Sequence, residues 1–149
     1  MTRRAGHACR SNLETVICLE MERQELPHEH RSLRFRVYDA RGGSTNYEPA
    51  IVAHRGPILF LVEPVESARS GTVRRFTGFL EQHSPEIVLV LATTDAAVHE
   101  IPPEAYDEIY GASEIGRLTA RIREQDPEGI VQPFHKSQRR VTRPRDTAK

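Results

Sequence analysis

The chain has 149 residues, of which 38% are hydrophobic and 28% charged, and its 21 basic and 21 acidic side chains give a formal net charge of +0. This length indicates one domain, and the balanced charge excludes a whole-molecule attraction to nucleic acid or to an anionic membrane. Two cysteines are too few for a disulfide framework, and no apolar run approaches the ~20 residues that span a bilayer. With no secretory signal before the cysteines, we expect a reducing, cytoplasmic location and no membrane partner.

The charge is distributed unevenly along the chain. Residues 136–149, KSQRRVTRPRDTAK, contain six basic residues and one acid, a local charge of +5 that leaves −5 on the first 135 residues. We therefore expect a single domain over residues 1–135 and a basic, disordered tail over 136–149. A mobile basic arm that binds phosphates is the alternative interpretation of the same tail.

The first predicted element is a helix over about residues 12–25. The sequence SNLE at 11–14 is typical of a capping box, in which the serine accepts from a backbone N–H and the glutamate reaches back. Apolar residues follow at helical spacing, and Pro27 ends the element. Glu20 falls on the same face as these apolar residues, so we expect this acid to point toward the core.

The central part of the chain reads as strands followed by a helix and a further strand. LRFRVYD at 33–39 alternates like a half-buried strand, ARGGSTN has the composition of a loop, and HRGP at 54–57 predicts a turn between strands at 51–53 and 58–62. These three strands would form an antiparallel meander. An amphipathic helix is predicted over about 73–83, and EIVLVLATT at 86–94 is a continuous apolar strand.

Two more helices are predicted toward the end of the domain. The first lies in IPPEAYDEIY at 101–110, where Pro103 suits a first helical turn, and the second in SEIGRLTARIRE at 113–124. The order of helix, three strands, helix, strand and two helices predicts an α/β fold, with helices on both faces of a mixed β-sheet.

The stretch PAIVAHRGPILFLVEPV at 49–65, in this order of elements, resembles the two-strand unit of the PD-(D/E)xK nuclease superfamily, which includes restriction enzymes and archaeal Holliday-junction resolvases. The resemblance implies a restriction-endonuclease-like sheet of about four core strands. It also implies phosphodiester hydrolysis assisted by Mg²⁺, which the family holds with an acid opening the second strand and the acid of Asp/Glu-x-Lys ending the third. The family's first helix often adds another acid.

Only part of that motif is present in this sequence. Glu63 matches the acid of the third strand, but Ala50 stands at the position of the second-strand acid and Val65 at that of the lysine. Glu48 and Glu20 are the acids that could rebuild the centre. The candidate catalytic residues are thus Glu63, Glu48 and Glu20, and Glu63 and Glu48 would bind Mg²⁺ or Mn²⁺ if a site survives. A single strand acid gives a hard cation too few oxygen ligands.

We therefore expect a nuclease-like fold with an incomplete catalytic centre that binds nucleic acid. An active metal-dependent DNA endonuclease with migrated catalytic residues is one alternative, and a protein-interaction or regulatory domain is the other. The candidate nucleic-acid-binding side chains are arginines near the crossover helix, of which Arg74 and Arg75 could reach back toward Glu63, and arginines of the tail. They are Arg69, Arg74, Arg75, Arg139, Arg140, Arg143 and Arg145.

Residues 100–114 form a second candidate interaction surface. Their acids are Glu100, Glu104, Asp107, Glu108 and Glu114. This surface should repel DNA, and with Tyr106 and Tyr110 exposed or half exposed it could meet a protein partner or a second copy of the chain as a homodimer.

The histidines of HEH at 28–30 suggest a zinc site with His7, Cys9 and Cys18. Eight residues separate the two cysteines, however, whereas common structural zinc motifs separate them by two to four. The spacing alone therefore does not favour zinc.

Overall fold

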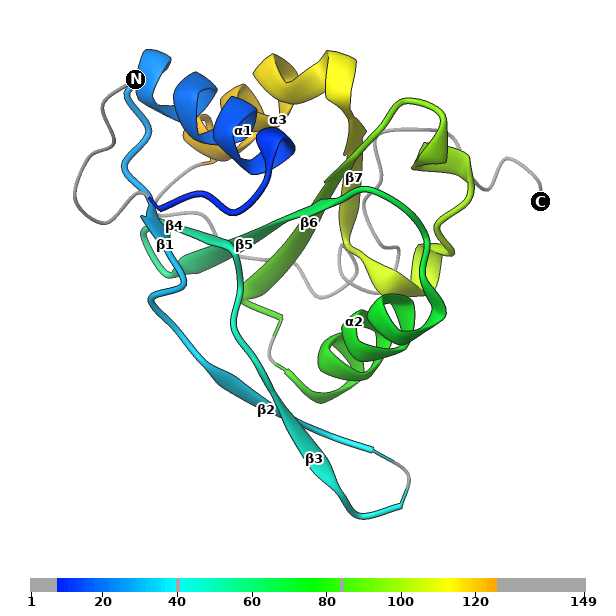
Figure 1. Cartoon of the computed structure of the whole chain (residues 1–149). Helices are drawn as coiled ribbons and strands as arrows, with labels where there is room; N and C mark the ends of the chain where they lie inside the picture. Colours follow the sequence, from blue (N-terminus) through cyan, green and yellow to red (C-terminus); the bar gives the residue numbers. More distant parts are fainter. Residues whose placement is uncertain (1–7, 40, 84, 126–149) are drawn as a thin grey trace.

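The computed structural model describes residues 8–39, 41–83 and 85–125 and shows a three-layer α/β/α sandwich (Figure 1). Helices α1 and α3 cover one face of a mixed sheet, and α2 covers the other. The sheet has five strands in the order β1 (Glu29–His30), β4 (Ile51–Arg55), β5 (Ile58–Val65), β6 (Ile87–Thr93) and β7 (Glu108–Gly111). The helices are α1 (Asn12–Arg23), α2 (Ser70–Gln82) and α3 (Ile115–Arg123), with short 3₁₀ turns η1 (Ala97–His99), η2 (Pro103–Ala105) and η3 (Ala112–Glu114).

One half of the sheet is antiparallel and the other is parallel. Strands β1, β4 and β5 pair antiparallel, and β5, β6 and β7 pair parallel, with α2 as the crossover from β5 to β6. The β4–β5 hairpin closes on a two-residue loop in which Gly56 has φ +60°, a conformation that glycine adopts without a steric penalty. Its register pairs Ile51 with Val62 and so brings Ala50 beside Glu63.

Alternation along the strands divides the core into two clusters. Toward α1 and α3, Ile51, Phe60 and Val90 pack with Ile17 and Leu118. Toward α2, the opposite face of the same strands packs against Phe76, Phe79 and the residues of η2. The central strands are thus covered on both sides, which accounts for their continuous apolar sequence.

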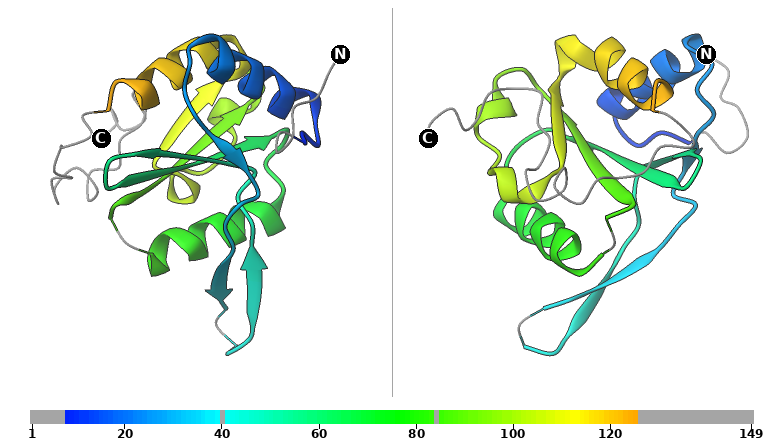
Figure 2. Two further views of the ribbon diagram at one scale, coloured as in Figure 1. Left: turned by 90° about the vertical axis from the view of Figure 1, so that its left-hand side faces the viewer. Right: turned by 180° about the vertical axis from the view of Figure 1, so that it is seen from behind.

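Strands β2 (Phe35–Tyr38) and β3 (Ser44–Tyr47) form a separate antiparallel hairpin that projects away from the sandwich in both views of Figure 2. The chain enters it after β1 and leaves it before β4. At its base, Phe35 and Tyr47 stack edge-on against Phe79 of α2. The side chain of Gln82 donates to the Tyr38 carbonyl and accepts from the Tyr38 N–H, each at 2.9 Å. The hairpin is therefore anchored to α2.

Several predicted elements are confirmed. The helices at 12–25, 73–83 and 113–124 are present, as are the buried strand at 86–94 and the antiparallel pair around HRGP. The predicted cap of the first helix is also present, since the Ser11 hydroxyl accepts from the Glu14 N–H at 3.0 Å.

The three-strand meander differs from the prediction. The strand within 33–39 does not join the main sheet, because it pairs with residues 44–47, of which 44–46 belong to the predicted loop ARGGSTN. Two-residue β1 takes its place beside β4. The main sheet accordingly has five strands where about four core strands were expected.

The predicted helix at 101–110 is wrong apart from the 3₁₀ turn η2 that begins at Pro103, and the predicted acidic surface is smaller than expected. Residues 108–111 form edge strand β7, and Tyr106 and Tyr110 are buried. Asp107 and Glu108 are also buried, because the Asp107 carboxylate accepts from the Leu89 N–H and Glu108 binds Arg121 and the Tyr110 hydroxyl. The predicted surface for a protein partner or a homodimer therefore cannot include Asp107, Glu108, Tyr106 or Tyr110, because these residues are buried.

None of the helices in the described parts of the chain is long and apolar enough to cross a lipid bilayer.

Candidate functional site

Glu63 is a buried carboxyl group near the end of β5, only 9% exposed. Its Oε2 accepts from the Tyr47 hydroxyl at 2.5 Å and from the Ala50 N–H at 3.1 Å. Burial disfavours the charged form and raises the pKa of Glu63 to about 7, although these two bonds and the nearby Arg75 and Arg31 act in the opposite direction. Glu63 therefore changes its charge near neutral pH.

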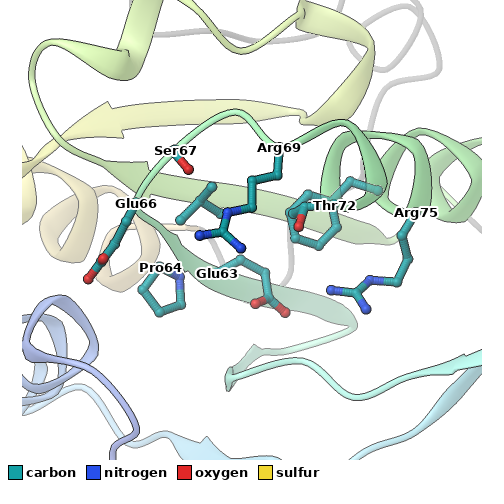
Figure 3. A pocket seen from close by; sticks show the side chains of 9 residues that line it. Glu63, Pro64, Glu66, Ser67, Arg69, Thr72 and Arg75 are labelled. Carbon is teal, nitrogen blue, oxygen red and sulfur yellow. The ribbon is translucent and has the colours of Figure 1, made fainter.

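A pocket of about 500 Å³ opens beside Glu63, between the end of β5 and the start of α2 (Figure 3). Arg69, from the connecting loop, and Arg75, from α2, extend toward the Glu63 carboxyl from two sides. The Arg75 guanidinium also lies over the rings of Tyr47 and Phe76, at 5.9 and 5.8 Å from their centroids. The complete lining is Glu63, Pro64, Val65, Glu66, Ser67, Arg69, Thr72, Arg75 and Phe76.

The start of α2 adds to the positive character of this pocket. No side chain caps the helix and no acid lies in its first turn, so the helix dipole is not offset there. Arg69 is the residue before the helix and Thr72 lies in its first turn, and both line the pocket. Two guanidinium groups, a hydroxyl and a helix N-terminus facing one pocket are suited to a phosphate group.

The three candidate catalytic acids do not form one cluster. Glu20 binds Arg23 and Gln24 on α1, and these bonds lower the pKa of Glu20 to about 2. Glu48 is exposed after β3 and lies 3.8 Å from Arg34. Within residues 8–39, 41–83 and 85–125, no group of three or more acids, histidines or cysteines suited to a metal includes Glu63, Glu48 or Glu20.

The two positions at which the motif departs from the nuclease family have different surroundings. Ala50 gives Glu63 a backbone N–H, while its side chain belongs to the core cluster that faces α1 and α3. Val65 is buried and lines the Glu63 pocket. Of the predicted arginines, Arg69 and Arg75 meet at this pocket and Arg74 is not among its lining residues. Residues 139–145 lie outside the described part of the chain.

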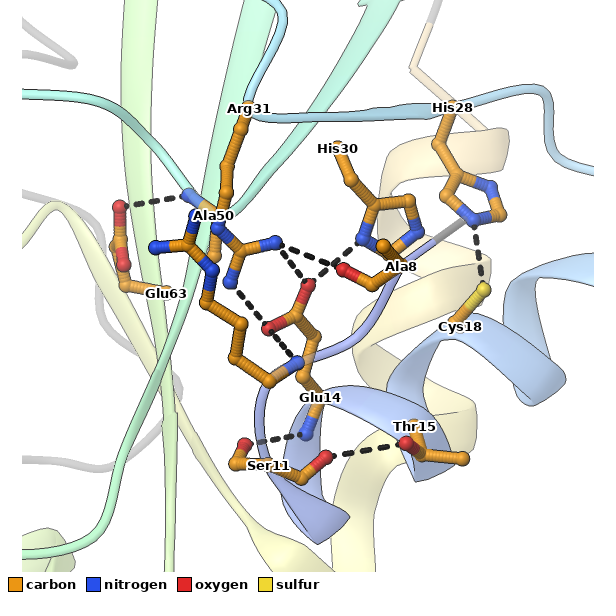
Figure 4. Close-up of polar contacts among 11 residues, drawn as sticks. Ala8, Ser11, Glu14, Thr15, Cys18, His28, His30, Arg31, Ala50 and Glu63 are labelled. Atoms are coloured by element: carbon orange, nitrogen blue, oxygen red, sulfur yellow. Dashed lines mark hydrogen bonds and ion pairs between the residues drawn. The ribbon is translucent and has the colours of Figure 1, made fainter. Parts of the chain in front are cut away.

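Glu14 is a second buried carboxylate, whose importance was not predicted from the sequence. It accepts from both terminal nitrogens of Arg31, at 2.6 and 2.9 Å, and lies 2.7 Å from Nδ1 of His30 (Figure 4). Burial raises its pKa, but the bonds from Arg31, His30 and the Arg10 N–H outweigh burial and lower it. Arg31 has φ +52°, a strained conformation that this carboxylate helps to hold.

Next to Glu14 the fold brings together residues that the sequence spacing had not favoured as a metal site. One ligand atom each from Cys9, Cys18 and His30 lies within 4.8 Å of the others. Among the described residues, this is the group of histidines, cysteines and acids whose ligand atoms are close enough to hold a metal, and its ligand atoms are sulfur and nitrogen. In the sequence, this site is indicated only by two cysteines and two histidines within 22 residues. Their spacing does not show that α1 and β1 bring them together in the fold.

A scan of protein-family models gives no match to this sequence, and a search of curated protein sequences gives no match either.

Proposed function

We propose that this chain is a nucleic-acid-binding protein of the PD-(D/E)xK superfamily, with a restriction-endonuclease-like fold and an incomplete catalytic centre. A backbone phosphate of the nucleic acid binds in the Glu63 pocket. The observation that carries the proposal is the pairing of Arg69 and Arg75 around a Glu63 whose expected partner acid and lysine are replaced by Ala50 and Val65.

The order of elements supports the fold assignment. Helix α1 is followed by three antiparallel strands, β1, β4 and β5, then by crossover helix α2 and the parallel strand β6. This is the same order of helix, three strands, helix and strand as in the resemblance, although its first strand is β1 and not the strand within 33–39, which belongs to the inserted β2–β3 hairpin. Glu63 lies on the third of those strands, where the resemblance expects an acid.

The surroundings of Glu63 favour phosphate over Mg²⁺. Magnesium prefers several oxygen ligands, whereas the groups that bind Glu63 are the Tyr47 hydroxyl and a backbone N–H, both of which donate protons. The positively charged guanidinium of Arg75 extends toward the Glu63 carboxyl, where a metal ion would have to bind, and it would repel that ion. With Glu63 protonated, the two guanidinium groups give the pocket a local charge that attracts a phosphodiester.

Fluorescence anisotropy with labelled duplex, single-stranded and branched DNA tests this proposal. In a salt titration, the double variant Arg69→Gln/Arg75→Gln should bind at least ~10-fold more weakly, and the slope of log affinity against log salt should fall by about 1 to 2, since each phosphate contact contributes about 0.9. Arg123→Gln is the matched control, because Arg123 is an exposed arginine of α3 on the opposite face of the sheet. Unchanged binding in the double variant would refute the pocket assignment.

Two further measurements separate the alternatives. A chain truncated after residue 135 should bind DNA more weakly if the basic tail contributes. Cleavage of the same DNA with Mg²⁺ or Mn²⁺, abolished by Glu63→Ala, would establish the active endonuclease instead. If no nucleic acid binds, an interaction domain becomes the better interpretation, although the burial of Tyr106 and Tyr110 gives that role less support.

A further inference from the structure

The cluster of sulfur and nitrogen atoms beside α1 has the composition of a metal site. Cys9 precedes the helix, Cys18 lies within it, and His30 belongs to β1. Their ligand atoms lie within 4.8 Å of one another, and the side chains of Cys18 and His30 are almost fully buried. Three separate segments of the chain thus contribute to one small volume.

His28 lies beside this group of Cys9, Cys18 and His30, in contact with Cys18. Its Nε2 lies 3.2 Å from Cys18 Sγ, and its ring packs edge-on against that of His30, with centroids 5.2 Å apart (Figure 4). Around a tetrahedral zinc ion, with Zn–S of about 2.3 Å and Zn–N of about 2.0 Å, neighbouring ligand atoms are ~3.3–3.8 Å apart. The His28–Cys18 separation is close to this value, whereas the ligand atoms of Cys9, Cys18 and His30, which lie within 4.8 Å of one another, have to close slightly around an ion.

The second shell orients both imidazole rings. His30 Nδ1 lies 2.7 Å from the Glu14 carboxylate, and His28 Nδ1 lies 2.9 Å from the Leu26 carbonyl. An Nδ1–H that donates to an oxygen leaves Nε2 as the nitrogen that can bind a metal. Carboxylate and carbonyl partners of this kind accompany metal-binding histidines in general.

The segment that carries Cys9 is held on both sides. The Arg31 guanidinium donates to the Ala8 carbonyl at 3.1 Å, and the Arg10 N–H donates to Glu14 at 3.1 Å. The Glu14–Arg31 ion pair therefore fixes the backbone on either side of Cys9, so this ligand is positioned before any metal binds.

We propose that Cys9, Cys18 and His30 bind a zinc ion that joins the N-terminal segment, α1 and β1, and that His28, beside Cys18, closes on the ion as the fourth ligand of a tetrahedral site. Two thiolates neutralise the ion's charge, which suits a buried location, and binding releases the two thiol protons to solvent. Thiolate and imidazole ligands select zinc over Mg²⁺. Because all four positions are filled by the protein, the site is structural, and it is independent of phosphate binding at Glu63.

Metal titration of the full chain tests the site. The protein is purified under reducing conditions, treated with a chelator and titrated with Co²⁺, and Zn²⁺ is then added. We expect one Co²⁺ per chain with the absorption of a tetrahedral, thiolate-ligated ion, its displacement by an equal amount of Zn²⁺, and a higher melting temperature with Zn²⁺ but not with Mg²⁺. Absence of the thiolate–cobalt absorption would overturn the proposal.

Variants separate the ligands from their surroundings. Cys9→Ser and Cys18→Ser should each lower metal affinity by more than the ~10–100-fold typical of losing a second-shell partner. His28→Gln, at a half-buried position, changes the cobalt spectrum even if a cysteine variant fails to fold, and the exposed His99→Gln is the control with wild-type binding. Wild-type affinity in both cysteine variants, or a Cys9–Cys18 disulfide that mass spectrometry finds in protein purified under reducing conditions, would contradict the site.

Discussion

Glu14 and Glu63 are both buried carboxyl groups, and the fold treats them in opposite ways. Glu14 accepts from a charged guanidinium, with Arg31 at 2.6 and 2.9 Å, and lies 2.7 Å from Nδ1 of His30, and its pKa is lowered. Glu63 receives a phenol hydroxyl and a backbone N–H, and its pKa rises to about 7. Burial alone therefore does not determine whether a carboxyl group is charged. The groups that donate hydrogen bonds to it, a guanidinium for Glu14 and neutral groups for Glu63, also determine its charge.

The difference separates a structural acid from one that can change its state. Glu14 is ionised across the physiological range, and its contribution to stability is present above about pH 4.5 and is lost as the pH falls through its lowered pKa. Glu63 stays protonated in the folded chain until the pH approaches 7. Its ionisation adds a negative charge to a pocket lined by Arg69 and Arg75.

The largest effect that tests this comparison is expected from Glu14→Gln. The substitution leaves the Arg31 guanidinium without its anion in a buried site, so the free energy of unfolding should fall by ~3–5 kcal/mol at pH 7. Urea unfolding followed by circular dichroism measures the change. A loss below ~1 kcal/mol would show that the Glu14 ion pair is not a main support of the fold.

A smaller and pH-dependent effect is expected from Glu63. Between its ordinary pKa of 4.5 and its raised pKa of about 7, the folded chain holds a proton that the unfolded chain has released. Stability therefore falls as the pH rises through this window, by about 3 kcal/mol in total. Glu63→Gln removes this dependence while keeping an oxygen that accepts from Tyr47 and Ala50.

The measurement is the difference in free energy of unfolding between Glu63→Gln and the wild type at pH 5 and at pH 8. The variant should gain stability relative to the wild type as the pH rises. Parallel curves for the two proteins would mean that Glu63 has an ordinary pKa, and the contrast with Glu14 would then disappear.

The smallest effect is expected from Glu20→Gln, at a half-buried site on α1. The Glu20 side chain is 19% exposed and its partner Arg23 is 71% exposed, so solvent screens this pair more than it screens Glu14, which is 1% exposed. Its loss should lower the free energy of unfolding by less than ~1 kcal/mol, and high salt should reduce the difference further. An effect as large as that of Glu14→Gln would show that exposure does not separate these acids.

The sequence predicted the strands that position Glu63 better than it predicted the residues around it. Continuous apolar strands and the HRGP turn predicted the antiparallel β4–β5 pair correctly, and the register of that pair brings Ala50 beside Glu63. Tyr47 was missed because its segment has the composition of a loop, and only its packing on α2 gives the hairpin its place. Long-range packing of this kind leaves no local pattern.

The acids on the other elements were harder to interpret. Glu14 matches a helix-capping pattern, which explains it locally and hides its contacts with Arg31 and His30, 17 and 16 residues away. The sequence predicted Asp107 and Glu108 as surface acids. In the structure both are buried, because Asp107 accepts from the Leu89 N–H of β6 and Glu108 pairs with Arg121 of α3. Ion pairs between distant elements therefore account for much of what the sequence could not predict.

The β2–β3 hairpin leaves and re-enters the sandwich between two neighbouring strands, β1 and β4. Phe79 contacts its base at Phe35, and Gln82 binds Tyr38 at the other end of β2, while the tip at residues 41–43 is exposed. Additional residues at this tip would not alter the sheet register, because the β1–β4 pairing does not pass through it. The tip is therefore a suitable insertion point for a fluorescent reporter or an affinity epitope.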